Sequence, residues 1–122
     1  ERALELNKET QLKPYIDIPR MARIAQRMIR ESLDAFVRED TDLALKVCKD
    51  DEEIDQLNSQ IFREVITFMI EDPHTINRAM KISSISKYLE RMADHATNIA
   101  EMVIFMVKGK SIRHMKDLPP SV

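Results

Sequence analysis

The chain has 122 residues, enough for one domain with a buried core and too few for two. One Gly and few aromatic residues disfavour a β-rich fold with many turns, whereas helix formers such as Ala, Leu, Met, Glu and Lys dominate. The net charge of −2 gives no general attraction to nucleic acid or anionic lipid, and the longest apolar runs are too short to cross a bilayer. With a single Cys and no visible signal peptide, we expect a cytoplasmic protein. Because the chain begins at Glu1 rather than Met, we also expect it to be a piece of a longer protein.

The first part of the chain predicts an incoming segment followed by a long helix. Residues 1–12 are expected to be the end of an incoming helix or a linker, and a three-helix bundle is expected over residues 13–110. Asp17 is the expected N-cap of the first bundle helix, with Pro19 in its first turn. Apolar residues then recur with helical period at Met21, Ile24, Ala25, Met28, Leu33, Phe36 and Val37. The acidic segment 39–42 ends this helix and offers Thr41 as the next N-cap.

Two further helices follow with short connections. The second has apolar residues at Leu45, Val47, Cys48, Ile54, Leu57, Ile61, Val65, Phe68 and Met69. The third has them at Ile76, Met80, Ile82, Ile85, Leu89, Met92, Ala96, Ile99 and Val103. Asp72 and Pro73 mark the turn between them, with Asp72 as the cap and Pro73 in the first turn.

The end of the third helix and the tail complete the predicted fold. Gly109 is expected to end the third helix in a left-handed conformation. Residues 111–122 contain Pro-Pro and are expected to form a loose C-terminal tail. Three antiparallel helices with short turns predict an all-α fold, an antiparallel up-down three-helix bundle.

Carboxylates on the second and third helices are predicted to face one another. Asp51 and Asp55 are four residues apart and share a helix face, as do Glu90 and Asp94. If the chain folds back at residues 72–73, Asp51 lies opposite Asp94 and Asp55 lies opposite Glu90. Four facing carboxylates repel unless a cation lies between them, and carboxylate oxygens suit Mg, Mn, Fe and Zn. The alternative is a solvated acidic face.

Four arginines form a stripe on the first helix, at Arg20, Arg23, Arg27 and Arg30. The stripe is a candidate surface for docking a partner, and ordinary solvent exposure or ion pairing is the alternative. Arg27 and Arg30 are also candidates for neutralising Glu90 and Asp94. No glycine-rich phosphate loop and no nucleophile–base motif is apparent.

Three segments carry a resemblance to a known family: "PYIDIPRMARIAQRMIRESLDAFVREDTDLA", "DDEEIDQLNSQIFREVITFMIEDPHTI" and "LERMADHATNIAEMVIFMVKGKSIRH". Together they resemble the PhoU family of bacterial phosphate-uptake regulators. The resemblance covers nearly the whole chain and includes a D-x-x-x-D helix followed by an E-x-x-x-D-H segment. Full-length members have two three-helix repeats, and this chain is similar to the second repeat.

The resemblance implies a metal site on the predicted carboxylate pairs. Family members bind multinuclear metal clusters through E(D)-x-x-x-D motifs, which correspond here to Asp51 with Asp55 and Glu90 with Asp94. Iron or zinc is favoured by the resemblance, and Mn or Mg would also suit carboxylates. We expect Asn98 and Glu101 to be outer or alternative ligands.

The resemblance also implies a regulatory function. The family represses phosphate uptake and the phosphate-starvation response, and is thought to connect the phosphate ABC transporter's ATPase to a phosphate-sensing histidine kinase. We therefore expect a non-catalytic adaptor without nucleic-acid partners, in contact with a membrane only indirectly. The alternatives are a carboxylate-bridged metalloenzyme of the hydrolase type and a metal-free helical interaction module. An isolated half is also expected to form homo-oligomers through apolar residues such as Met102, Ile104 and Phe105.

Overall fold

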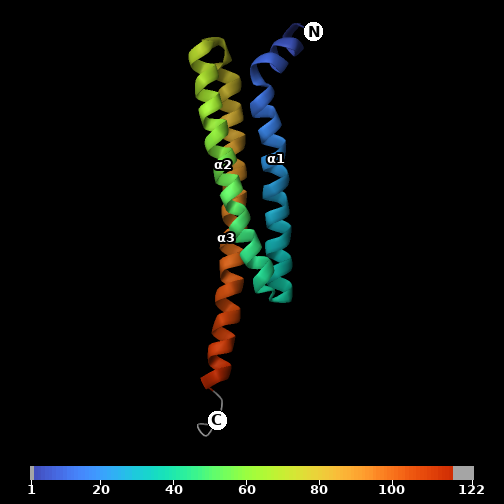
Figure 1. Ribbon diagram of the computed structural model, residues 1–122, viewed down its shortest axis with the longest axis vertical. Helices are drawn as coiled ribbons and strands as arrows, with labels where there is room; N and C mark the ends of the chain where they lie inside the picture. The colour runs from blue at the N-terminus through green and yellow to red at the C-terminus, as the bar shows by residue number, and fades with distance from the viewer. Residues whose placement is uncertain (1, 117–122) are drawn as a thin grey trace.

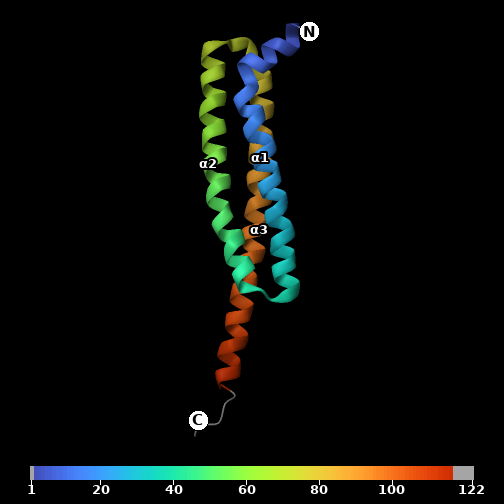
Figure 2. The ribbon, with the colours of Figure 1, turned by 45° about the vertical axis from the view of Figure 1, so that its right-hand side comes forward.

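The computed structural model describes the backbone of residues 2–116 and the side chains of residues 17–112. It has three long helices, α1 (Arg2–Arg38), α2 (Thr41–Glu71) and α3 (Ile76–Lys116), and a 3-10 turn, η1 (Pro73–Thr75), between α2 and α3. The helices run in alternating directions side by side, and α3 continues well beyond the turn between α1 and α2 (Figures 1 and 2). The expected all-α three-helix bundle is confirmed, and residues 2–116 contain no strand.

The turn between α1 and α2 is made by Glu39 and Asp40. Glu39 has a φ of 54°, the left-handed conformation that commonly follows a helix end. Asp40 has extended backbone, and its side chain accepts a hydrogen bond from the Leu43 backbone N–H at 3.0 Å. The predicted break in the acidic segment is therefore confirmed, but Thr41 is not the N-cap. Thr41 already has helical backbone, so the cap is the preceding residue, whose carboxylate reaches the free N–H at Leu43.

The turn between α2 and α3 has the predicted chemistry. Asp72 has extended backbone, and its side chain accepts from the His74 N–H at 3.0 Å while Pro73 occupies the first position of η1. Buried Thr75 donates its hydroxyl hydrogen bond to the carbonyl oxygens of Asp72 (2.7 Å) and Phe68 (3.1 Å). These short-range bonds fix where the chain reverses direction, and so they fix the pairing of α2 with α3.

The predicted helix start at Asp17 is wrong. α1 is one helix from Arg2 to Arg38 and includes Pro14 and Pro19, so the expected break between residues 1–12 and the bundle is absent from the backbone. A proline inside a helix removes one hydrogen bond and bends the helix, but the bonds on either side of it can continue. Figure 1 shows the first turns of α1 bending away from the bundle.

The predicted stop at Gly109 is also wrong. α3 continues to Lys116, and Gly109 does not have a positive φ. Glycine inside a helix costs only about 1 kcal/mol relative to alanine, so it does not by itself end one. The next residue, Lys110, contacts both carboxylate oxygens of Glu39 at 2.9 Å and joins this part of α3 to the α1–α2 turn. Residues 111–116 of the expected loose tail are therefore helical, and residues 117–122 lie outside the described part of the chain.

The core is a stripe of small and medium apolar side chains along all three helices. Its buried members are Met21, Ile24, Ala25, Met28, Ala35, Ala44, Val47, Ile54, Leu57, Ile61, Val65, Ala79, Ile82, Leu89, Ala93, Ala96, Ala100 and Val103. Alanine is frequent among them, which lets the helix backbones approach closely. Most predicted core positions near the middle of the helices are confirmed.

Several predicted core positions are instead exposed. They are Leu33, Phe36, Val37, Leu45, Ile76, Met80 and Ile85. At the end of α1, Ser32 and Ala35 are fully buried and take the inward positions, which turns Leu33, Phe36 and Val37 outward. The apolar residues of a helix therefore occupy a wider part of its surface than the two neighbouring helices bury.

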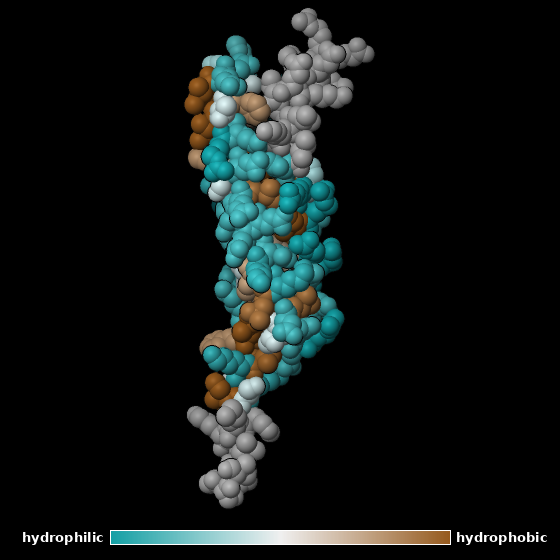
Figure 3. Space-filling view, in the orientation of Figure 1, coloured by the Kyte–Doolittle hydropathy of each residue, from teal (hydrophilic) through white to brown (hydrophobic). Residues whose placement is uncertain are grey.

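Exposed apolar surface gathers towards the two ends of the molecule in the view of Figure 3, and the middle of this face is mostly hydrophilic. Ile70 near the α2–α3 turn and Phe105 in the last third of α3 are each 77% exposed. Met102 is also exposed, whereas Ile104 is partly buried against the core. Within the described part of the chain, no helix has both the length and the apolar character needed to cross a membrane.

Candidate functional site

The pairing of α2 with α3 follows the register predicted from the turn. That register places residue 58 opposite residue 87. In the structure, the buried Ser86 hydroxyl donates to Asn58 Oδ1 at 2.6 Å, and Asn58 Nδ2 donates to Glu90 Oε2 at 3.2 Å. Asn58 thus contacts two consecutive turns of α3 on either side of the predicted position, so the predicted carboxylate pairs lie at one level of the bundle.

Five carboxylates of α2 and α3 lie near one another around Asp51, and we call them the acidic face: Asp51, Asp55, Glu90, Asp94 and Glu101. Asp51 is half-buried, and its pKa is raised to about 6. Burial is the main cause of this shift, and repulsion from the other four carboxylates adds to it. Asp51 Oδ1 is buried, and no side chain or backbone group of the described residues forms a hydrogen bond with it. The other three residues paired from the sequence, Asp55, Glu90 and Asp94, are therefore close enough to Asp51 to raise its pKa.

No cation of the described residues neutralises the acidic face. None of its five carboxylates has a Lys, Arg or His nitrogen within ion-pairing distance among the side chains of residues 17–112. The idea that Arg27 and Arg30 neutralise Glu90 and Asp94 is wrong. Arg27 contacts Asp50 at 3.1 Å, and Arg30 has no ion pair with any described residue.

The acidic face is not arranged as a closed metal cage. Among the described side chains, no group of three or more His, Cys, Asp or Glu residues is placed so that it could hold an ion. Asp55, Asp94, Asn98 and Glu101 are exposed, so their side chains have room to change rotamer, while Asp51 and Glu90 are partly buried. The donor set suits a hard cation, and binding one would require these side chains to converge.

Two residues near the acidic face were not predicted to belong there. Asn58 holds Glu90 through its side-chain amide, and burial with the charges of Glu101 and Asp51 raises the pKa of the Cys48 thiol. Both follow from helical spacing, because Cys48 lies three residues before Asp51 and Asn58 lies seven after it. The sequence pattern assigns Cys48 only to the core. In the structure it is partly buried, packs against the core and lies at the edge of the acidic face.

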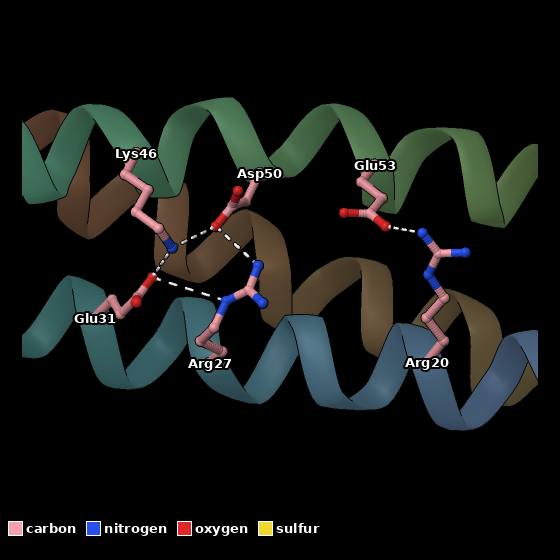
Figure 4. Close-up of polar contacts among 6 residues, drawn as sticks. All are labelled: Arg20, Arg27, Glu31, Lys46, Asp50 and Glu53. Atoms are coloured by element: carbon pink, nitrogen blue, oxygen red, sulfur yellow. Dashed lines mark hydrogen bonds and ion pairs between the residues drawn. The ribbon is translucent and has the colours of Figure 1, made fainter.

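Half of the arginine stripe holds α1 against α2. Arg20 forms an ion pair with Glu53, and Arg27 joins a ring of charges with Asp50, Lys46 and Glu31 (Figure 4). Lys46 Nζ lies 2.8 Å from Glu31 Oε1 and 3.2 Å from Asp50 Oδ2. The hydrogen bond to Glu31 is the main cause of the raised pKa of Lys46, and the bond to Asp50 adds to it. These contacts confirm the ion-pairing alternative for Arg20 and Arg27.

The other half of the stripe is free in the described part of the chain. Arg23 and Arg30 are exposed, and neither has an ion pair or a side-chain hydrogen bond with residues 17–112. The stripe predicted from the sequence therefore contains two structural arginines and two available ones.

Three long helices with an acidic face and an arginine stripe define a charged helical-bundle protein. The PhoU domain family matches residues 18–103. The chain belongs to the PhoU family, and the resemblance noted in its sequence is confirmed.

Relatives of known name agree with this assignment. The chain is 41% identical over 115 residues to the phosphate-specific transport system accessory protein PhoU homolog of Pseudomonas aeruginosa, covering 93% of this chain and 48% of that protein. It is 42% identical over 114 residues to the homolog of Aquifex aeolicus, covering 93% and 52%. Homolog 2 of Thermotoga maritima is 33% identical over 117 residues, covering 96% and 50%.

A solved structure confirms the fold. The crystal structure of PhoU from Pseudomonas aeruginosa matches with a TM-score of 0.76 and 43% identity, over 78% of this chain and 46% of that chain. The chain thus spans about half the length of the relatives it matches.

Proposed function

We propose that this chain is a regulatory adaptor of phosphate homeostasis whose acidic face binds metal ions. The family membership and the name shared by the relatives, phosphate-specific transport system accessory protein, support a role beside a phosphate transporter. In this proposal the chain acts in the cytoplasm, as a negative regulator of phosphate uptake and the starvation response. Its partners are the ATPase of the phosphate ABC transporter and a phosphate-sensing histidine kinase, and it catalyses no reaction.

The observation that carries the metal proposal is the surroundings of Asp51. Its buried Oδ1 has no described hydrogen-bond partner, burial and four neighbouring carboxylates raise its pKa to about 6, and no described cation compensates these charges. A bound cation would supply the missing positive charge. Asp51 and Asp55 from α2 and Glu90 and Asp94 from α3 would hold it, with Asn98 and Glu101 as outer or alternative ligands.

The regulatory consequence is a change in the rigidity of α2 and α3. Without a cation the facing carboxylates push the two helices apart, and with one they would hold them together. Iron or zinc is the favoured metal, and Mn or Mg remains compatible with oxygen ligands. A surface on these helices would then have one defined shape that a partner recognises.

Metal binding can be tested on the 122-residue chain. We expect Fe²⁺, Zn²⁺ or Mn²⁺ to raise the melting temperature of the chelator-treated chain, because a ligand at 100 times its Kd stabilises by about 2.7 kcal/mol. Elemental analysis after desalting should find the same metal retained. The variant Asp51→Asn/Asp94→Asn should lose both effects.

A matched control keeps this test specific. The variant Glu52→Gln/Glu71→Gln also removes two carboxylates from exposed positions of α2, and neither residue has an ion pair with any described residue. It should keep the metal-dependent rise in melting temperature. A similar loss in both variants, or no rise in the unaltered chain, would overturn the metal proposal.

The metal-free interaction module is a second candidate, favoured by the lack of a preformed three-residue ligand group among the described side chains. Pull-down with the transporter ATPase and the cytoplasmic part of the sensor kinase separates the two. The metal-binding adaptor predicts capture that depends on metal and is lost in Asp51→Asn/Asp94→Asn. The metal-free module predicts capture that is unchanged by chelator. Metal-dependent phosphatase turnover lost in the same variant would instead support the hydrolase.

A further inference from the structure

The arginine stripe lines an open surface hollow of about 540 Å³ between α1 and α2. Its lining consists of Arg20, Arg23, Ile24, Gln26, Arg27, Arg30 and Glu53. Four of these seven residues are arginines and only one is acidic, although the whole chain has a net charge of −2. The hollow is therefore a local concentration of positive charge in an otherwise slightly negative molecule.

The arginines of the hollow differ in how they are held. Arg20 and Arg27 are fixed by ion pairs to Glu53 and Asp50, which orient their guanidinium groups between α1 and α2 (Figure 4). The side-chain N–H groups of Arg23 and Arg30 form no hydrogen bond with any described residue. Arg27 Nε is buried and has no hydrogen-bond partner there, and it lies 3.9 Å from Glu31 Oε1. Fixed and free donors thus line the same concave surface.

The lining favours a small anion over a protein partner. Protein hot spots pair arginines with large aromatic anchors in packed pockets, whereas this lining has no aromatic residue and its only aliphatic residue, Ile24, is 5% exposed. The hollow also has no aromatic side chain on which a nucleobase could stack. Guanidinium groups present paired N–H donors that match the oxygens of a phosphate group.

We propose that this hollow binds a phosphate dianion, either free inorganic phosphate or the phosphate of a small ester. The inference goes beyond the adaptor function and does not depend on the metal proposal, because it concerns other side chains on another pair of helices. The site would let the chain respond directly to the concentration of phosphate. Because the arginines are partly exposed and two already have partners, we expect dissociation constants in the millimolar range.

The test is an NMR titration of the ¹⁵N-labelled 122-residue chain at about pH 7.5, with ionic strength held constant by potassium chloride. Inorganic phosphate should shift the arginine Nε–H signals of Arg23, Arg27 and Arg30 and reach saturation. Glycerol phosphate, titrated separately, shows whether the site also accepts an ester. Shifts that rise linearly without saturation, or that potassium chloride alone reproduces, would overturn the proposal.

Two variants, each with a matched control, test the site further: one should weaken phosphate binding and the other should strengthen it. Arg23→Gln/Arg30→Gln should weaken phosphate binding about tenfold, because it removes the free half of the stripe and leaves the pairs to α2 intact. Arg63→Gln/Arg91→Gln removes the same charge from exposed positions outside the hollow and should leave affinity unchanged. An equal loss of phosphate affinity in this variant and in its control would mean that only net charge matters, and the site would be rejected.

The other variant, which should strengthen phosphate binding, removes the one carboxylate in the lining of the hollow. Glu53→Gln releases Arg20 and removes a charge that repels phosphate, so affinity should rise several-fold. Its control, Glu52→Gln, makes the same charge change at the neighbouring exposed position, outside the hollow. An increase no larger than that in the control would contradict binding in the hollow. Melting curves of all four variants would show that the fold is retained.

Discussion

Replacing Asp51 by Asn should stabilise the metal-free chain. In the folded state Asp51 bears a charge that is partly buried and surrounded by four other carboxylates. The unfolded chain relieves this repulsion, so folding is less favourable when Asp51 is ionised. Asparagine has nearly the same shape and no charge, and it therefore removes the repulsion without leaving a cavity.

The size of the effect follows from the pKa. A rise from 3.8 to about 6 corresponds to about 3 kcal/mol, at 1.36 kcal/mol per pKa unit. Because Asp51 is only partly buried and water screens its neighbours, we expect a gain of about 1–2 kcal/mol at about pH 7.5. Folding raises this pKa, so the penalty is absent below pH 3.8, grows as the pH rises and is complete above about pH 6.

The assay is urea denaturation followed by circular dichroism, in the presence of chelator, at several pH values from about 7.5 down to about 4. The control Glu52→Gln removes a carboxylate from the next position of α2, which is exposed and outside the acidic face, and should change stability by less than about 0.5 kcal/mol. The reasoning would be refuted if Asp51→Asn gave no gain at the upper end of this pH range. A gain that persisted undiminished near the lower end would refute it too.

Three other substitutions test separate parts of the structure. Gly109→Ala should stabilise by about 0.5–1 kcal/mol in the same urea assay, because the residue is helical and an added Cβ meets nothing within 4 Å; a loss would indicate a left-handed glycine. Lys46→Gln should destabilise by at most about 1 kcal/mol, since Lys46 is half exposed, and the difference should shrink in high salt. Folding raises the pKa of Lys46, so its contribution is present below pH 10.5 and is lost as the pH rises above that value; a loss independent of salt would argue against the charge ring. Phe105→Ser should shift any homo-oligomer towards monomer in sedimentation velocity without lowering the melting temperature, because Phe105 is 77% exposed; an unchanged oligomer would exclude this end of α3 as the interface.

Local chemistry made much of the fold predictable from the sequence. Asp72 and Pro73 specify a turn through hydrogen bonds within a few residues. The position of this turn then determines which residues of α2 and α3 face one another. That is why the position of the turn alone predicts the pairing of Asp51 and Asp55 with Asp94 and Glu90. The pKa of Asp51, which responds to all of these residues, agrees with the predicted level.

The errors arise where the outcome depends on interactions distant in sequence. Gly109 has a high intrinsic tendency to end a helix, but Lys110 bridges from α3 to Glu39, 71 residues earlier in the chain. Likewise, nothing local shows that Ser32 rather than Leu33 faces the core, because that depends on how α1 is rotated against its neighbours. Helical period predicts that an apolar face exists, and only the packing decides which side chains belong to it.

Carboxylates between α1 and α2 are neutralised by arginines, whereas those between α2 and α3 are not neutralised by any described residue, and this difference bears on function. The chain has 19 basic and 21 acidic residues, so it contains enough cations to neutralise nearly every carboxylate. Between α1 and α2, carboxylates such as Asp50 and Glu53 are paired with Arg27 and Arg20. Between α2 and α3, the acidic face has no such partner among the described residues, although Asp51 is the carboxylate whose pKa is raised by burial and repulsion.

Stability alone does not account for this distribution, because moving a single cation towards Asp51 would relieve the repulsion. Proteins retain such locally unfavourable arrangements mainly where a ligand or partner compensates them. The uncompensated charge on the acidic face and the free donors of Arg23 and Arg30 are in this sense the same kind of feature, with opposite sign. Each leaves the bundle short of a counter-charge that an external ion can supply, and this is the physical reason for assigning a cation to α2 and α3 and a phosphate dianion to α1.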